Sequence, residues 1–367
     1  MNRKNLRIAA PAAMLALALG LSACGAGNED ASAGETSAAA GDGVSGTLNG
    51  AGSSAQEAAV AAWKQQFQTA NPDATVNYDP VGSGGGREQF IAGGVSFAGS
   101  DAYLSDDELA GAKKRCGSEV VEVPTYVSPI AVVYNLDGVD DLNLSPDTVA
   151  GIFAGKITTW DDAAIKADNP DAKLPSTKIT PVHRSDDSGT TQNFTDYLSK
   201  AAPKVWTDEP AQTWPVKGGE AAEGTSGVIS AVSGGNGTVG YADESQAGKL
   251  GMAKVKVGDE FVAPTPEAAA KVLETAKPVA GRATTDIAID IDRTTEAAGV
   301  YPIVLASYQM ACQSYPDAET ADLVKAWLTY VTSPEGQDAS AKAAGSAPLS
   351  GDFASTVQAA VKTIKAA

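Results

Sequence analysis

The chain has 367 residues, of which 43% are hydrophobic and 20% are charged, a globular composition too long for one small core. We therefore expect two folded domains. The formal net charge of −18 argues against nucleic acid as a partner and against polybasic membrane binding. Three cysteines, one histidine and no close Cys/His spacing leave no zinc or iron–sulfur motif, so no metal or other cofactor is expected.

The N-terminus is typical of an export signal followed by a lipid-attachment site. Arg3, Lys4 and Arg7 precede an apolar run at residues 8–19 that is shorter than an ordinary membrane span. The next residues, Leu21-Ser22-Ala23-Cys24, resemble the lipobox of bacterial lipoproteins, in which the cysteine is lipidated and becomes the mature N-terminus. We therefore expect lipidation at Cys24. The alternative is an ordinary signal peptide that contains an incidental cysteine.

A tether is expected between this signal and the folded part. Residues 1–23 form the expected lipoprotein signal peptide, and residues 25–43 contain no large apolar side chain. Such a composition predicts a disordered tether, which we assign to residues 24–44. The folded part would then lie beside the cell membrane on its extracytoplasmic face. No later segment is apolar enough to span the membrane.

Three strand-to-helix turns follow in the first half of the folded part. A strand at residues 44–50 ends in Gly50-Ala51-Gly52-Ser53-Ser54, and a strand at residues 97–101 ends in Gly99-Ser100-Asp101. Between them, a strand at residues 74–79 runs into Val81-Gly82-Ser83-Gly84-Gly85-Gly86, before a short helix at residues 88–92. Ligands of open α/β sheets bind at such strand ends, and glycines there allow close backbone approach.

The glycine-rich second turn has other possible interpretations. It could be a flexible loop with no role in binding. A Walker A loop fits poorly, because no Gly-Lys-Ser/Thr follows, and a dinucleotide fingerprint recurs easily in a chain with 38 glycines.

Two crossovers are expected to join two lobes. Apolar runs at residues 119–123 and 130–134 are separated by Pro124 and Pro129, and a further apolar run occurs at residues 301–305. We place the passages between the lobes at these two stretches. The C-terminal part then supplies two amphipathic helices.

A candidate anion site lies in the middle section, at residues 178–191. A short strand is predicted at residues 178–182, and Ser188 is a suitable N-cap for the helix that follows. The Ser-Gly-Thr start of that helix offers unpaired N–H groups and two hydroxyls to a small anion. Arg184 adds a bidentate donor, and Asp186 is close enough in sequence to orient the guanidinium. The alternative is a capped helix with a surface Arg–Asp pair.

Four of these motifs, in this order, resemble those of the phosphate-binding proteins of ABC importers. They are Gly50-Ala51-Gly52-Ser53-Ser54, Val81-Gly82-Ser83-Gly84-Gly85-Gly86, Gly99-Ser100-Asp101-Ala102 and Arg184-Ser185-Asp186-Asp187-Ser188-Gly189-Thr190. Residues 155–162 and Trp214-Pro215 match that family too. The likeness runs from about Ser45 to the C-terminus, and four motifs in order are far more specific than any one of them.

The resemblance implies an α/β, two-lobed periplasmic-binding-protein fold, type II-like, with a ligand cleft between lobes joined by the two crossovers. Lobe I would comprise residues 45–124 and 303–367, and lobe II would comprise residues 125–302. Asp101 would accept a hydrogen bond from a phosphate O–H, and Asp186 would hold Arg184 in place. Matched position by position, the implied phosphate ligands are Ser54, Ala55, Ser83, Asp101, Arg184, Ser188, Gly189 and Thr190.

Two positions depart from the pattern of this family. Ala55 stands where a bulky residue is common, but only its backbone donor is implied in binding. Gly84 replaces a second serine that many relatives carry. The change at Gly84 could remove one hydrogen bond to the charged ligand, which would cost about 1.5–3 kcal/mol.

The resemblance implies a lipid-anchored extracytoplasmic receptor that binds inorganic phosphate and delivers it to the membrane permease of an ABC importer. It implies no enzymatic activity. One alternative is a phosphatase or serine hydrolase that uses Ser188 with His183, although a nucleophile usually needs a base within reach and a third group to orient that base. Another is a receptor for sulfate, molybdate or tungstate, which Asp101 disfavours. A role in surface signalling or adhesion is compatible with the receptor function.

Cys116 and Cys312 remain after Cys24 is assigned to lipidation. Exported proteins meet an oxidising environment. Cys116 precedes the strand that leads into the first crossover, and Cys312 ends the strand that leaves the second. We therefore expect a disulfide between these neighbouring strands of lobe I; the alternative is a pair of buried free thiols.

Overall fold

The structure is a computed structural model that describes residues 43–367, so the expected signal peptide, Cys24 and nearly all of the tether lie outside the described residues. No helix within residues 43–367 is long and apolar enough to cross a membrane.

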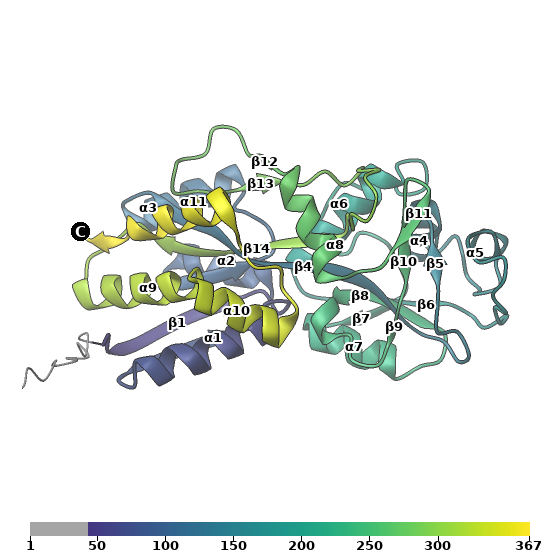
Figure 1. Cartoon of the computed structure of the whole chain (residues 1–367), viewed down its shortest axis with the longest axis horizontal. Coiled ribbons are helices and arrows are strands. Elements are labelled where there is room, and N and C mark those ends of the chain that lie inside the picture. The colour runs from purple at the N-terminus through teal and green to yellow at the C-terminus, as the bar shows by residue number, and fades with distance from the viewer. Residues whose placement is uncertain (1–42) are drawn as a thin grey trace, which may run out of the picture. The chain divides into compact units, whose positions relative to one another are not determined.

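Strands and helices alternate along much of the described chain (Figure 1). In the first part the elements are β1 (Gly46–Gly52), α1 (Glu57–Ala70), β2 (Ala74–Asp79), α2 (Ser83–Ala92), β3 (Phe97–Ser100), α3 (Asp106–Cys116) and β4 (Val120–Asn135). The middle part has β5 (Asn143–Leu144), α4 (Pro146–Phe153), α5 (Ala163–Asp168), β6 (Thr180–Arg184), α6 (Gly189–Ala201), β7 (Glu220–Ala222), α7 (Gly224–Ser233), β8 (Thr238–Asp243) and η1 (Glu244–Gln246).

The later elements include several short strands before the chain returns to three long helices. They are β9 (Gly251–Met252), β10 (Lys254–Val257), β11 (Glu260–Val262), α8 (Pro266–Ala270), η2 (Lys271–Glu274), β12 (Lys277–Pro278), β13 (Ile289–Asp290), β14 (Val304–Cys312), β15 (Ser314–Tyr315), α9 (Ala318–Val331), α10 (Pro334–Ala344), α11 (Gly351–Lys362) and β16 (Lys365–Ala366). The predicted α/β class is confirmed.

The largest sheet of the described residues has nine strands, in the order β2-β1-β3-β14-β4-β8-β6-β7, with β9 also paired to β4. Parallel pairing joins β1 to β2 and β3 at one end, and β6 to β7 and β8 at the other. Between them, β14 and β4 are antiparallel to each other. Residues 120–129 of β4 pair with β14, and residues 130–135 of the same strand pair with β8. This one strand therefore connects the two halves of the sheet.

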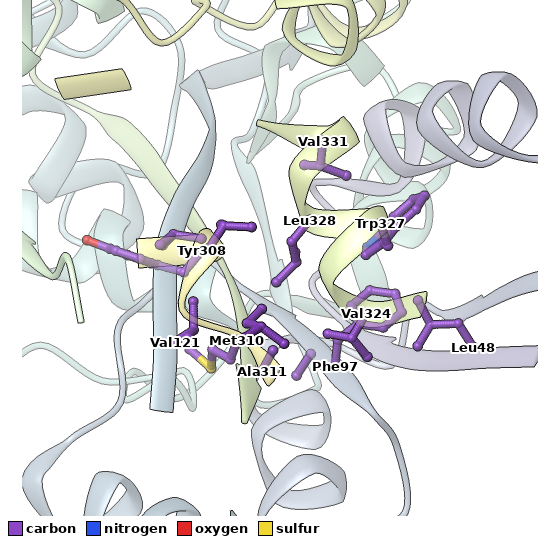
Figure 2. Close-up of a cluster of buried hydrophobic side chains, with 14 of the residues drawn as sticks. Leu48, Phe97, Val121, Tyr308, Met310, Ala311, Val324, Trp327, Leu328 and Val331 are labelled. Carbon is purple, nitrogen blue, oxygen red and sulfur yellow. The ribbon is translucent and has the colours of Figure 1, made fainter. Parts of the chain in front are cut away.

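Two hydrophobic cores flank this long strand, and the elements packed around each are called the first and second lobes below. In the first core, Val324, Trp327, Leu328 and Val331 project from α9 toward the strands (Figure 2). The Trp327 ring lies 5.7 Å from that of Phe97, centroid to centroid. The second core gathers around aromatic rings, with Phe194 and Tyr241 stacked at 4.4 Å. Burial of these large rings is the main driving force for each lobe.

The strand β4 is continuous, whereas the sequence predicted two strands separated by Pro124 and Pro129. Proline lacks the N–H that a central strand needs, and it is tolerated at bulges and strand ends. Pro124 pairs with Tyr308 where the register of β14 shifts, and Pro129 pairs with Val304, the first residue of β14. Pro124 therefore lies at the register shift, and Pro129 lies opposite the end of β14.

Helix α2 begins at Ser83, so the predicted start at Glu88 was wrong and the glycine-rich turn forms its first turns. Gly82 adopts a φ of 89°, which side chains other than glycine rarely accept, and this turns the chain straight into the helix. Gly82 is therefore needed for the local geometry of this turn.

The segment at residues 277–291 packs against the first lobe, although the expected boundaries put it in the second. Glu122 N donates to Thr285 O at 3.0 Å, and Ile287 N donates to Glu122 O at 2.8 Å. Arg282 also donates to Leu104 O at 2.8 Å. These contacts join residues far apart in sequence, which a pattern search along the chain does not detect.

A disulfide joins Cys116 to Cys312 within the first lobe, across a sequence separation of 196 residues, which supports the pairing expected from the sequence. It ties the end of α3 to the end of β14. We predict that replacing both cysteines with serine lowers the free energy of unfolding by about 2–5 kcal/mol, because the unfolded chain loses a long-loop constraint. Chemical denaturation of the variant and of reduced wild-type protein should give the same loss. Two titratable thiols in unreduced, unfolded wild-type protein would contradict the pairing.

Candidate functional site

The candidate site lies where the two lobes meet, at the ends of parallel strands from both sides. In the first lobe, the turns after β1, β2 and β3 carry Ser54, Ser83 and Asp101. In the second lobe, Arg184 ends β6 and the turn after it leads to Ser188, and β7 leads into α7. The N-termini of α1, α2, α6 and α7 follow these strand ends, and helix N-termini offer unpaired N–H groups and partial positive charge to anions.

Arg184 is buried and held by Asp186, as the sequence analysis expected. The Nε atom of Arg184 donates to Asp186 Oδ1 at 2.7 Å, and a terminal nitrogen donates to Oδ2. Burial would raise the pKa of Asp186, but the hydrogen bond to Arg184 and its positive charge outweigh burial and lower it. Asp186 also accepts from Gly224 N at 3.0 Å, and Tyr241 OH accepts from Arg184 N at 3.2 Å. The guanidinium is therefore held by both oxygens of Asp186, which is itself held by Gly224, while Tyr241 fixes the backbone of Arg184.

Ser83, Asp101, Gly189 and Thr190 lie together across the boundary between the lobes. Asp101 is buried, and its backbone N–H donates to Ser83 Oγ at 3.1 Å. Thr190 Oγ1, from α6 of the second lobe, donates to Asp101 Oδ2 at 3.1 Å. Gly189 begins α6 against both first-lobe residues, where a Cβ atom would lie 2.6 Å from Ser83 Oγ. The hydroxyl of Thr190 thus contacts Asp101, a contact that sequence reasoning did not foresee.

Ser54 and Ala55 complete the first-lobe side. Ser54 Oγ accepts from Thr225 N at 3.0 Å and lies 3.1 Å from Thr225 Oγ1, so this turn faces the start of α7. Ala55 N donates to Ser53 Oγ at 3.1 Å, and its methyl group packs in the second core. The small side chain at position 55 therefore allows the first-lobe turn to pack closely against the second lobe.

Ser188 is the N-cap of α6, as predicted, and its Oγ accepts from Thr191 N at 3.1 Å. The first N–H groups of an α-helix have no acceptor within the helix. In α6 these belong to Gly189 and Thr190, at the same helix start that approaches Ser83 and Asp101.

Gly84 lies directly against the second lobe, which gives its departure from the family pattern a physical explanation. Its N–H donates to Asp187 O at 2.9 Å. A Cβ atom on Gly84 would lie 2.5 Å from Asp187 Cβ, closer than packed atoms tolerate. A serine there could not fit in this arrangement, so the missing side chain allows a direct backbone contact between lobes.

We predict that Gly84→Ala weakens anion binding by about tenfold or more, since overpacking of about 1–3 kcal/mol would oppose closure of the lobes. Gly85→Ala is the matched control, because it lies in the same helix and its Cβ atom would contact only Val81 of the same lobe. Titration calorimetry of both variants measures the difference. Equal affinities would show that the Gly84 contact does not contribute to binding.

Four residues near the site were not singled out by sequence reasoning. Thr225 lies in the first turn of α7, and Ser53 is the neighbour of Ser54 in the same turn. Buried Arg87 contacts Glu108, Ser100 and, across the lobes, Gln212. Ser307 had no local signal, since it lies in the apolar strand β14 and reaches the site only through sheet pairing.

The donors and acceptors together suit a small oxyanion that carries a proton. Backbone N–H groups, hydroxyls and a guanidinium donate, and the Asp101 carboxylate is placed to accept. No group of three or more metal-ligating side chains occurs among residues 43–367.

The fold and this site define a class, the two-lobed solute-binding proteins, and comparisons with known proteins narrow it. Residues 37–335 match the PBP superfamily domain. The chain is 38% identical over 332 residues to phosphate-binding protein PstS3 of Mycobacterium bovis (strain BCG / Pasteur 1173P2), covering 87% of this chain and 89% of the relative. It is also 38% identical over 369 residues to PstS2 of the same strain, covering 97% and 98%. The chain belongs to the PstS phosphate-binding protein family.

Solved structures agree with this assignment. A high-affinity periplasmic phosphate-binding protein bound with phosphate matches with a TM-score of 0.72 at 25% identity, covering 86% of this chain and 93% of the other. A human phosphate-binding apolipoprotein matches with a TM-score of 0.66 at 21% identity, covering 85% and 93%, which supports the fold alone. The predicted two-lobed binding-protein fold is confirmed, and the named relatives are binding proteins rather than enzymes.

Proposed function

We propose that this chain is an extracytoplasmic receptor that binds inorganic phosphate between its lobes, is lipid-anchored through Cys24 and delivers phosphate to the permease of an ABC importer. The observation that carries the proposal is that the Arg184–Asp186 pair, Asp101 and the starts of α1, α2, α6 and α7 lie along the same boundary between the lobes. Membership of the PstS family supports phosphate as the ligand.

In this proposal each candidate residue has a role set by its chemistry. Arg184, held by Asp186, binds two phosphate oxygens. Asp101 accepts from the phosphate O–H. The remaining ligands offer N–H or O–H groups at strand ends and helix starts: Ser54, Ala55, Ser83, Ser188, Gly189 and Thr190. On binding, the Ala55 N–H would exchange its bond to Ser53 Oγ for one to the anion. The lobes would be bounded as the sequence suggested, at residues 45–124 with 303–367 and at residues 125–302, except that residues 277–291 associate with the first lobe.

The contacts of Ser188 and His183 disfavour a hydrolase. Ser188 Oγ accepts the Thr191 N–H as a helix cap, and Ser188 is fully buried. His183 Nδ1 lies 2.9 Å from Arg184 O, and its ring stacks on Trp214 at 5.2 Å. Nucleophilic catalysis requires a base within hydrogen-bond reach of the nucleophile, and no hydrogen bond joins these two side chains among the described residues.

Titration calorimetry of the whole chain, purified in detergent, tests the proposal. We expect one phosphate per chain, little or no binding of sulfate, and no turnover of a chromogenic phosphate ester. Binding of sulfate in preference to phosphate would favour a receptor for an unprotonated oxyanion, and ester turnover abolished by Ser188→Ala would favour the hydrolase.

Lipid anchoring makes a separate prediction. Cys24→Ala should release the protein from the membrane fraction or block its processing, because the thiol that carries the lipid is gone. Ser22→Ala keeps a small residue before the cysteine and serves as the control, which should stay with the membrane. Fractionation followed by immunoblotting measures both, and equal membrane retention of Cys24→Ala and wild type would contradict lipidation at this residue.

A further inference from the structure

The carboxylate of Asp101 receives hydrogen bonds from three separate parts of the chain. Ser53 Oγ, in the turn after β1, donates to Asp101 Oδ1 at 2.5 Å. Ser307 Oγ, in β14, donates to the same oxygen at 2.6 Å. Thr190 Oγ1, in α6, donates to Oδ2 at 3.1 Å. Two of these three hydroxyls belong to residues without a place in the proposed ligand set.

The distribution of these bonds over the two oxygens is unequal. A carboxylate accepts about four hydrogen bonds, about two on each oxygen. Oδ1 already accepts from two hydroxyls, whereas Oδ2 accepts from one. Oδ2 therefore keeps an acceptor position, and the carboxylate cannot rotate to exchange its oxygens without breaking both bonds to Oδ1.

The hydroxyl proton of Ser53 is used in the hydrogen bond to Asp101. Ser53 Oγ accepts from Ala55 N at 3.1 Å, and a hydroxyl has a single proton, which it directs to Asp101. Ser53 and Ser307 are both buried, so water has little access to replace either bond. Ser307 also lies where the pairing of β14 with β4 shifts register, next to its hydrogen bond with Asp101.

We propose that Ser53 and Ser307 are specificity-determining positioning residues, which hold Oδ1 of Asp101 so that only Oδ2 is presented to a tetrahedral oxyanion carrying a proton. This inference rests on the proposed phosphate-binding function. The ligand class it defines is phosphate and arsenate, each of which has an O–H to donate to Oδ2 near neutral pH. Sulfate has none, so one of its oxygens would face the acceptor position that Oδ2 keeps, with no proton between the two oxygens.

Removing these hydroxyls should change the relative affinities for the three anions, which a loss of folding stability would not do. Without them the carboxylate can turn, and its Oδ2 no longer meets the ligand O–H at a fixed angle. Phosphate and arsenate should therefore weaken together, while sulfate should not weaken. A fault in folding or closure would weaken all three anions alike.

The test compares Ser53→Ala, Ser307→Ala and the double variant with wild type, using the whole chain and titrations of phosphate, arsenate and sulfate. We expect the ratio of phosphate to sulfate affinity to fall by about tenfold or more in the double variant. Ser307→Thr keeps the hydroxyl and should keep the ratio. Ser340→Ala is the matched control, because Ser340 is fully buried in the first lobe and its hydroxyl is hydrogen-bonded to Ser346.

Each outcome decides the proposal. An unchanged ratio in folded single variants overturns it, even if phosphate binding itself is normal, and the proposed function then stands alone. A parallel loss for all three anions also overturns it. If wild-type protein binds no phosphate, the proposed function and this inference fail together. Near-ultraviolet circular dichroism identifies variants that have not folded, and the single variants then supply the answer.

Discussion

Asp101→Asn is expected to narrow the preference for phosphate over sulfate by about tenfold or more. Phosphate near neutral pH carries at least one proton, and an ionised carboxylate can accept a hydrogen bond from that O–H. Sulfate has no proton and would bring only lone pairs and negative charge to the buried carboxylate. Asparagine keeps the size of the side chain, removes the charge and supplies a donor. A site that forms one buried hydrogen bond with its ligand can discriminate against an analogue without that group by a factor of about 10⁴–10⁵. A large change in the ratio of phosphate to sulfate affinity is therefore possible.

A control must separate this effect from a general change of charge near the cleft. Asp290→Asn removes the same charge from the wall of a 580 Å³ cavity that Asp101 also lines, and the Asp290 carboxylate is hydrogen-bonded to Tyr103. Its anion preference should match that of wild type. If Asp101→Asn binds phosphate normally and still rejects sulfate, Asp101 is not the group that distinguishes a protonated anion from an unprotonated one. Its role is then to stabilise the turn.

Arg184→Ala is expected to reduce phosphate affinity by about a hundredfold or more, because two charge-assisted hydrogen bonds contribute about 1.5–3 kcal/mol each. The change also leaves Asp186 near the anion without its partner. Since Arg184 opposes the effect of burial and lowers the pKa of Asp186, that pKa should rise in the variant. Arg184→Lys keeps the charge but not the two-pronged geometry, and should bind phosphate with intermediate affinity.

The first lobe offers a matched control for Arg184. Arg282 is also largely buried and pairs with a carboxylate, Asp286, at 3.1 Å, but it contacts none of the proposed ligands. Arg282→Ala should lower thermal stability and leave phosphate affinity unchanged. Equal affinity losses in the two variants would mean that Arg184 acts through stability alone.

Local patterns predicted the parts of the site that are continuous in sequence. The turn after β1, the Arg184–Asp186 pair and the Ser188 cap depend on neighbours within a few residues, and each forms as expected. The start of α2 was missed because its glycines, which are poor helix formers, were interpreted as part of the turn before the helix. The continuity of β4 was missed because the prolines interrupt the sequence pattern, whereas in the sheet one lies at a register shift and the other opposite the end of β14.

Long-range contacts explain what sequence reasoning could not reach. Ser307 is 206 residues from Asp101, and no periodicity marks one serine of a buried strand as a partner of a distant carboxylate. The contact of Thr225 with Ser54 spans 171 residues. The packing of residues 277–291 on the first lobe likewise depends on three-dimensional pairing with Glu122. Such contacts depend on the tertiary arrangement, whereas helix caps and turns depend on residues that are close together in the sequence.

A crystal structure of the protein grown with phosphate tests the central claim most directly, because it locates the anion and its partners. The proposal requires one phosphate between the lobes, with two of its oxygens bound by Arg184 and its O–H directed to Oδ2 of Asp101. Hydrogen bonds from Ser54, Ser83 and the first N–H groups of α6 should complete its coordination. Phosphate bound elsewhere, or bound in the cleft without contact to Arg184 and Asp101, would contradict it.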